Sequence, residues 1–77
     1  MSGTVDLWGP EPLYVQIAGV LRGRIQDGSY PPRRALPTPD TLAAEFNVSR
    51  NTVRAALAML TSEGMVQGVK GKGTYVV

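Results

Sequence analysis

Arg50, Asn51 and Arg54 are spaced so that their side chains share one face of a predicted helix over residues 49–63. Arginine can donate two hydrogen bonds to O6 and N7 of guanine, and asparagine can form a similar two-pronged contact with N6 and N7 of adenine. An ordinary solvated face is the alternative, but such a face typically mixes Glu and Lys at i, i+4. This face holds no acidic residue before Glu63. The pattern therefore favours a helix that reads base edges.

The opposite face of the same segment is predicted to be buried. Its apolar residues repeat at i, i+3, i+4 and i+7, the spacing of a core-facing stripe: Val53, Ala56, Leu57 and Leu60. The hydroxyl of Ser49 can cap the start of this helix, and Gly64 is placed to end it.

A second helix is predicted just before it. Thr38 suits the N-cap, Pro39 suits the first helical position and Asp40 suits the positive end of the helix dipole. The helix is expected to run to about Glu45, and Asn47 tolerates the left-handed conformation that a sharp turn needs. Helix, tight turn and helix at this spacing predict a helix-turn-helix.

The chain before this unit predicts a scaffold helix and a loose arm. From Pro12 onward, large apolar residues recur every four positions: Leu13, Ile17, Leu21 and Ile25. Gly28 suits the residue just past the helix end, and the Pro-Pro pair at 31–32 predicts an extended connection. Residues 1–11 show no periodicity and are expected to form a flexible N-terminal arm.

After Gly64 the apolar period becomes two-fold. Residues 65–69 and 74–77 predict two short strands, joined by a Lys-Gly-Lys-Gly hairpin over residues 70–73. Two lysines without bulk between them can approach a phosphate backbone or a minor groove, although a soluble turn is the alternative. The fold class predicted for residues 12–77 is mainly α with a small β-hairpin wing. It is a winged helix-turn-helix of three helices and a two-stranded antiparallel wing.

Composition excludes several classes of function. The 77 residues include no Cys and no His, which removes disulfides, structural zinc sites, thiol catalysis and every triad that needs an imidazole. The six acidic residues form no paired motif, so we expect no enzyme, no cofactor and no metal. No apolar run approaches the ~18 residues of a membrane span, so no membrane partner is expected. Residues 1–4 show no signal-peptide pattern, and the predicted location is the cytoplasm.

The net charge is only +2, but the cations are unevenly placed. Residues 1–49 hold four Arg against five acidic residues, whereas residues 50–77 hold four Lys or Arg against one acidic residue. An electropositive C-terminal third points to an anionic partner, and nucleic acid is the usual one. On charge alone, a merely solvated surface is an equal alternative.

Together these motifs resemble the DNA-binding domain of the GntR family of bacterial transcription regulators. The resemblance covers about residues 12–77, and its most specific segments are residues 48–54 (Val-Ser-Arg-Asn-Thr-Val-Arg) and 71–76 (Gly-Lys-Gly-Thr-Tyr-Val). It implies a domain that binds a palindromic operator in double-stranded DNA as a homodimer, mostly to repress transcription at the nucleoid. The DNA contacts that it implies, residue by residue, are Thr38, Ser49, Arg50, Asn51, Thr52, Arg54, Lys70 and Gly71. Lys72 joins them from its place in the hairpin.

The sequence departs from the family pattern at three positions. Asp40 stands where some members use an arginine for DNA contact, and an acid there should repel phosphate unless it accepts from N4 of cytosine. Arg33 replaces the glycine of a common Pro-Gly pair and can compensate by adding a cation to the DNA-binding surface. Asn47 replaces a common glycine in the turn between the helices.

The resemblance also bears on assembly. Family members usually carry a larger C-terminal domain that binds a small effector and makes most of the dimer contact, so an effector is expected only where such a domain follows. The sequence has no long heptad seam, and we expect a monomer in dilute solution that pairs cooperatively on DNA. A winged helix used for protein–protein or RNA contact is the alternative function. Its mark would be an apolar outer face on the third helix, which this sequence lacks.

Overall fold

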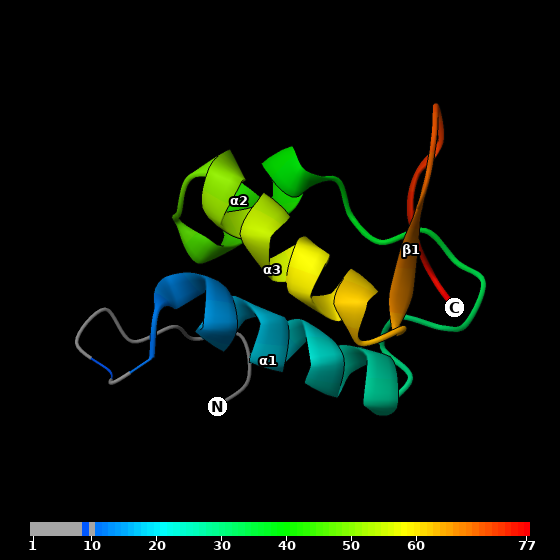
Figure 1. Cartoon of the computed structure of the whole chain (residues 1–77), viewed down its shortest axis with the longest axis horizontal. Coiled ribbons are helices and arrows are strands. Elements are labelled where there is room, and N and C mark those ends of the chain that lie inside the picture. The colour runs from blue at the N-terminus through cyan, green and yellow to red at the C-terminus, as the bar shows by residue number, and fades with distance from the viewer. Residues whose placement is uncertain (1–8, 10) are drawn as a thin grey trace.

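The predicted helices and hairpin are all present in the computed structural model, which describes residue 9 and residues 11–77 (Figure 1). The helices are α1 (Leu13–Gln26), α2 (Pro39–Phe46) and α3 (Arg50–Ser62), and the strands are β1 (Val66–Val69) and β2 (Gly73–Val76). The predicted arm over residues 1–11 lies outside the described residues except for Gly9 and Glu11. Three helices followed by a two-stranded antiparallel hairpin confirm the predicted fold class.

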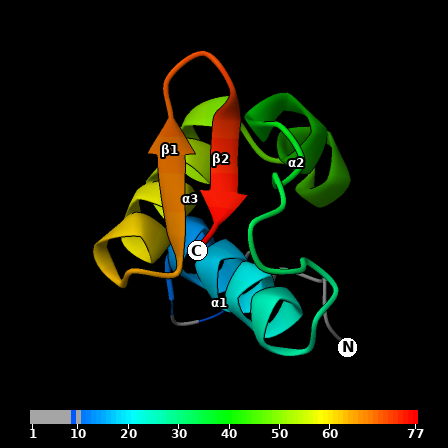
Figure 2. The ribbon, with the colours of Figure 1, turned by 90° about the vertical axis from the view of Figure 1, so that its right-hand side faces the viewer.

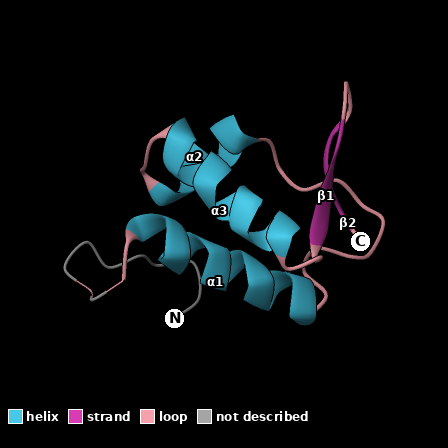
Figure 3. Cartoon of the chain, in the orientation of Figure 1, coloured by secondary structure: helices cyan, strands magenta, loops and turns pink. Residues whose placement is uncertain are grey.

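The three helices pack together, and the hairpin stands at one end of them. α3 contacts α1, α2 and β1, and α1 runs along the opposite side of the molecule from α2 (Figure 1). The tip of the hairpin points away from α1, towards the side on which α2 lies, as both ribbon views show (Figures 1 and 2). Helices and strands occupy separate parts of the molecule (Figure 3). The hairpin is therefore an appendage to a helical body.

One apolar core is assembled from every helix and both strands. The whole predicted stripe of α3 is buried: Val53, Ala56, Leu57 and Leu60. The other elements add Ile17, Ala18, Leu21, Leu42, Phe46, Val66 and Val76, and the connection before α2 adds Leu36. Leu13 and Ile25, at the two ends of the stripe predicted for α1, are only half-buried. Because its neighbours cover the inner face of α3, the opposite face is left to solvent.

Local side chains set the ends of α2 and α3 as predicted. The hydroxyl oxygen of Thr38 accepts from the backbone N–H of Thr41 at 3.2 Å, and that of Ser49 accepts from Thr52 at 3.1 Å. Both residues are therefore N-caps. Asn47 has a φ of 56°, the left-handed conformation expected for the turn between the two helices. The helix-turn-helix is thus encoded locally.

Other boundaries differ by a residue from those predicted. α1 begins at Leu13 with Pro12 as its N-cap, and α2 includes Phe46 because this residue faces the core. Gly73, which was predicted to lie in the hairpin loop, is the first residue of β2 and pairs with Val69. The loop therefore consists of residues 70–72.

The extended connection predicted from the proline pair is wrong at its start. The N–H of Arg34 donates to the carbonyl of Pro31 at 3.3 Å, and Arg33 has a φ of 64°. These are the features of a type II β-turn, in which proline suits the second position and glycine the third. A proline restricts only itself and the residue before it, so the pair could not determine the conformation of Arg33.

Residues 33–36 then pair with the edge of β2 that β1 leaves open. The N–H of Leu36 donates to the carbonyl of Thr74 at 2.8 Å, and the N–H of Val76 donates to the carbonyl of Arg34 at 2.9 Å. β2 is therefore hydrogen-bonded on both edges. The second set of bonds ties the wing to the segment that leads into α2.

Two ion pairs fasten α1 to the other helices. Arg22 donates from Nε and Nη2 to the two carboxylate oxygens of Glu63, at 2.9 and 2.7 Å. Arg24 pairs with Glu45 in the same two-pronged way and also donates to the hydroxyl of Tyr30 at 2.7 Å. Hydrogen bonds from each arginine favour the ionised carboxylate, which lowers the pKa of its glutamate below the ordinary value of 4.5.

We expect these pairs to make the protein less stable in acid. A carboxylate with a lowered pKa in the folded state stabilises the protein above the ordinary value of 4.5, and this contribution is lost as the pH falls through the folded pKa. Glu45→Gln and Glu63→Gln should each lower the free energy of unfolding near pH 7 and have progressively less effect towards about pH 2. For the partly exposed Glu45 the loss should stay below about 1 kcal/mol. Urea denaturation across this pH range measures it.

Glu11→Gln is the matched control, because it makes the same charge change at an exposed residue that forms no ion pair within the described part of the chain. It should leave the stability unchanged at every pH. An equal loss of stability at both ends of the range in Glu45→Gln or Glu63→Gln would contradict the assignment of these pairs.

Candidate nucleic-acid interface

The first turns of α2 and α3 meet at one surface. Nε of Arg50, the first residue of α3, lies 2.5 Å from Oδ1 of Asp40, the second residue of α2, and the two side chains form an ion pair. Both side chains point to solvent, since Arg50 is 56% exposed and Asp40 is 68% exposed. The sequence predicted that Asp40 would repel an anionic partner, but it did not predict this pair. The starts of α2 and α3 therefore lie next to each other on the surface, and the exposed carboxylate of Asp40 lies between them.

Each helix start carries a pair of hydroxyl groups. Thr38 Oγ1 lies 2.9 Å from Thr41 Oγ1, and Ser49 Oγ lies 2.9 Å from Thr52 Oγ1. Each pair has two hydroxyl protons and uses one between its oxygens, so one proton remains to donate outward. The first backbone N–H groups of a helix also lack intrahelical acceptors, and together with the helix dipole they favour anions such as phosphate. Sequence reasoning missed Thr41, although its spacing from Thr38 repeats that of Ser49 and Thr52.

The outer face of α3 is exposed as the sequence predicted. Asn51, Arg54 and Ala58 are all exposed. The side chains of Asn51 and Arg54 form no hydrogen bond or ion pair with the residues that the structure describes. Thr61 lies on the same face, but its hydroxyl donates to the carbonyl of Leu57 at 2.9 Å. The donors and acceptors of Asn51 and Arg54 are thus available to a ligand.

The hairpin tip presents Lys70 and Lys72 on either side of Gly71. All three residues are exposed. The N–H of Lys72 donates to the carbonyl of Val69 at 2.9 Å, and Gly71 has a φ of 80°, so Gly71 fills the left-handed position of the turn. The family resemblance implied Gly71 as a DNA contact, and the structure adds a conformational reason for a glycine here.

We call the combined region the contact surface. It consists of the first turns of α2 and α3, the outer face of α3 and the hairpin tip: Thr38, Asp40, Thr41, Ser49, Arg50, Asn51, Thr52, Arg54, Lys70, Gly71 and Lys72. The hairpin tip points to the same side of the molecule as α2 (Figure 2).

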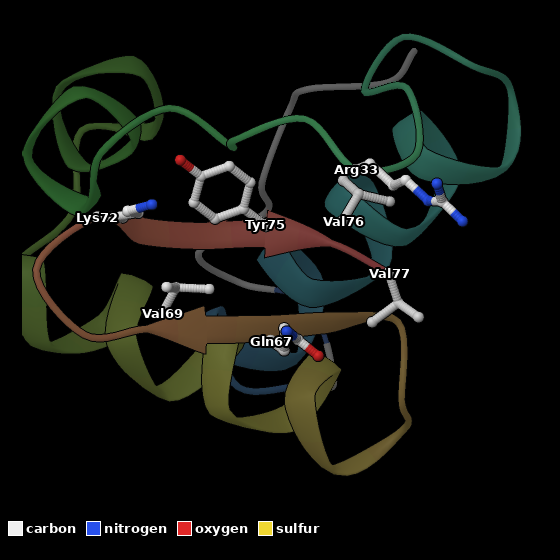
Figure 4. Close-up of a pocket in the computed structure, with 7 residues that line it drawn as sticks. All are labelled: Arg33, Gln67, Val69, Lys72, Tyr75, Val76 and Val77. Atoms are coloured by element: carbon white, nitrogen blue, oxygen red, sulfur yellow. The ribbon is translucent and has the colours of Figure 1, made fainter.

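Arg33 is separated from this group. It lies beside Val76 and Val77 at the base of the hairpin, whereas Lys72 lies at the opposite end of β2 (Figure 4). Its N–H donates to the carbonyl of Val76 at 2.9 Å. The ion-pair partner of Asp40 is Arg50 and not Arg33. That Arg33 adds a cation to the DNA-binding surface stays a prediction.

The hairpin also forms a shallow hollow of about 370 Å³, lined by Arg33, Gln67, Val69, Lys72, Tyr75, Val76 and Val77 (Figure 4). Its lining includes no acidic residue that could bind a metal ion or act together with a catalytic base. Over residues 9 and 11–77, no group of acidic side chains could hold a metal ion. No helix in the same part of the chain is long and apolar enough to cross a membrane.

Comparison with known proteins finds close relatives of this sequence. The family model described as "Bacterial regulatory proteins, gntR family" matches residues 13–76. The mannosyl-D-glycerate transport/metabolism system repressor MngR of Escherichia coli (strain K12) is 47% identical over 68 residues, which are 88% of this chain and 28% of MngR. The HTH-type transcriptional repressor NagR of Bacillus subtilis (strain 168) is 42% identical over 72 residues, which are 94% of this chain and 30% of NagR. The chain thus spans less than a third of these curated relatives.

A solved structure shares the whole fold. The crystal structure of AraR(DBD) in complex with operator ORX1 matches with a TM-score of 0.88 and 33% identity, covering 96% of this chain and 94% of that chain. The arrangement of helices and hairpin described above is therefore one that a similar domain has in a complex with operator DNA.

The conformational role of Gly71 can be tested with a matched pair of variants. A side chain added at Gly71 or at Gly68 would meet no atom within 4 Å, but of these two glycines Gly71 alone has a positive φ. Gly71→Ala should therefore destabilise the domain by about 1 kcal/mol through backbone strain alone. Gly68→Ala should be neutral or slightly stabilising, because alanine reduces the entropy of the unfolded chain. Thermal unfolding measures both, and equal effects would contradict the role assigned to Gly71.

Proposed function

Since this chain belongs to the gntR family of bacterial regulatory proteins, we propose that it binds an operator in double-stranded DNA and represses transcription. The observation that carries this proposal is the contact surface, which joins two helix starts, a polar helix face and a basic hairpin tip. The proteins MngR and NagR, to which the chain is similar, are both repressors. The family is one of regulatory proteins and not of enzymes, in agreement with the absence of a catalytic set from the sequence.

In this proposal α3 enters the major groove. Arg50, Asn51 and Arg54 read base edges, because their side chains offer the donors and acceptors that guanine and adenine match. The hydroxyl pairs and N–H groups at the starts of α2 and α3, including Thr38, Ser49 and Thr52, bind phosphates and set the position of the helix. Lys70 and Lys72 lie on the backbone or in the minor groove beside it, with Gly71 allowing a close approach. Arg33 would contribute only at the base of the wing.

The alternative function, a winged helix for protein–protein or RNA contact, has less support. A protein-binding face would be expected to gather apolar and aromatic side chains, but the outer face of α3 is polar and basic. The major groove of A-form RNA is too narrow and deep for side chains to read, so a recognition helix suits DNA better. The proposed place of action is the nucleoid in the bacterial cytoplasm. A small-molecule effector belongs to the proposal only where a C-terminal domain accompanies this one.

The proposed reading of bases can be tested by comparing Arg54→Ala with Lys72→Ala, which remove the same charge from different parts of the contact surface. In vitro selection from random duplexes first defines the sequence that the wild-type chain prefers. Arg54→Ala should then weaken binding to that sequence by about 1–3 kcal/mol and relax the preference at one base position. Lys72→Ala should weaken binding to all sequences alike and reduce the slope of log K against log salt by about one unit. Fluorescence anisotropy titrations measure both variants.

Retention of the full base preference by Arg54→Ala would show that α3 does not read the major groove. An unchanged salt slope in Lys72→Ala would leave the hairpin tip as an ordinary turn. A parallel selection from random RNA that yields ligands bound more tightly than the selected duplex would favour the alternative function.

We also propose that two copies bind a palindromic operator and that they associate mainly on the DNA. A two-fold operator places two weak sites next to each other, which raises the effective concentration of the second copy. Sedimentation of the chain alone should therefore show a monomer at micromolar concentration. Titration of a full palindrome should give a higher affinity per half-site than titration of a single half-site. A stable dimer without DNA, or equal affinity per half-site, would contradict this mode of assembly.

A further inference from the structure

The ion pair between Asp40 and Arg50 lies within the contact surface and contributes little to holding the fold together. Arg50 is 56% exposed and Asp40 is 68% exposed, so water screens the pair. The two pairs that α1 forms with the other helices are less exposed and connect helices that share the core. The position of the Asp40–Arg50 pair therefore indicates a role in how Arg50 binds a ligand at the contact surface.

The atoms that form this pair leave the outer edge of Arg50 open. The ion-pair contact is between Oδ1 of Asp40 and Nε of Arg50, 2.5 Å apart, and Nη1 and Nη2 form no hydrogen bond with any residue among 11–77. Those two nitrogens form the fork that O6 and N7 of guanine accept. An arginine that is not held samples many rotamers, and ordering it on binding costs conformational entropy. The ion pair with Asp40 favours one position of the guanidinium before DNA arrives and so removes part of this cost.

The charge of Asp40 acts in the opposite direction. Its carboxylate lies beside two helix starts that are otherwise suited to phosphate, and it repels the DNA backbone whatever the base sequence. Arg50 offsets this repulsion only where a guanine accepts hydrogen bonds from its Nη1 and Nη2. The same carboxylate thus weakens binding to the wrong sequences and supports binding to the right one, and specificity is the difference between these two affinities.

We propose that Asp40 is a specificity-determining residue that positions Arg50 to read a guanine. This inference rests on the proposed function, namely that α3 lies in the major groove of an operator. Asp40 would affect the base preference by positioning Arg50, and it would not contact a base itself.

The test is a double-mutant cycle that compares four proteins: the wild-type chain, Asp40→Asn, Arg50→Ala and the double variant. Each protein is titrated at one salt concentration against the selected duplex, its single-base variants and a random duplex. Asp40→Asn should reduce the preference for guanine at one position by about two- to fivefold. It should also strengthen binding to the random duplex by about twofold or more, because a negative charge is gone. In the Arg50→Ala background it should reduce the preference no further.

Two controls separate this effect from general changes. Glu11→Gln makes the same charge change at an exposed position before α1 and should alter neither the guanine preference nor the binding to random DNA. Asp40→Asn should unfold at nearly the wild-type temperature, since the exposed ion pair and the interaction of Asp40 with the helix dipole each contribute little to stability.

Three results would overturn the inference. An unchanged guanine preference in Asp40→Asn would show that Arg50 needs no positioning. An equal loss of preference with and without Arg50 would show that Asp40 contacts a base itself, such as N4 of cytosine. A wild-type chain without any base preference would overturn the proposed function as well. If instead Arg54→Ala weakens the base preference and Asp40→Asn does not, the inference about Asp40 fails while the proposed function stands.

Discussion

The orientation of α3 depends on the burial of its inner face, and the contact surface depends on the orientation of α3. Val53, Ala56 and Leu60 are fully buried and Leu57 is 7% exposed. A helix turns by about 100° per residue, so a shift of this stripe by one position would swing Asn51 and Arg54 more than a quarter turn away. Such a shift would empty leucine sites in a closely packed core, and truncating one buried leucine typically costs about 2–5 kcal/mol. The apolar stripe therefore fixes the direction in which the polar face points.

β2 provides the second constraint, because it holds the wing and the start of α2 in one frame. Its hydrogen bonds to β1 on one edge and to residues 33–36 on the other leave little freedom for the hairpin to swing as a whole. The segment that it binds leads directly into Thr38, the cap of α2. The hairpin tip and the two helix starts are consequently positioned by the same set of backbone bonds. A surface that must follow the shape of a duplex gains from this arrangement, since less ordering is left for the moment of binding.

The features that the sequence predicted are those encoded by neighbouring residues. The caps Thr38 and Ser49, the left-handed Asn47 and the stripe of α3 depend on residue types within one or two helical turns, and all of them are found as predicted. Two of the features that it missed are local, namely the hydroxyl of Thr41 beside Thr38 and the turn at Arg33. The others arise from contacts between separate segments. The Arg22–Glu63 pair joins residues 41 positions apart, and the pairing of residues 33–36 with β2 spans a similar distance along the chain. No local pattern marks which acid an exposed arginine will meet, which is why Asp40 was predicted to repel a ligand and not to hold Arg50.

The use of the cations bears on how such a small domain could bind an operator. Arg22 and Arg24 are occupied by pairs within the fold, and Arg50 shares its charge with Asp40. Within the described part of the contact surface, this leaves Arg54, Lys70 and Lys72 as the cations without an ionic partner. Sequence-independent affinity for DNA grows with the number of phosphates neutralised, so one copy with so few cations would bind any duplex weakly. Base contacts and the joining of two copies on one operator would then have to supply most of the affinity, and both depend on sequence. A sparse set of cations would therefore favour selectivity, because little binding would remain at sites that lack either the right bases or the second half-site.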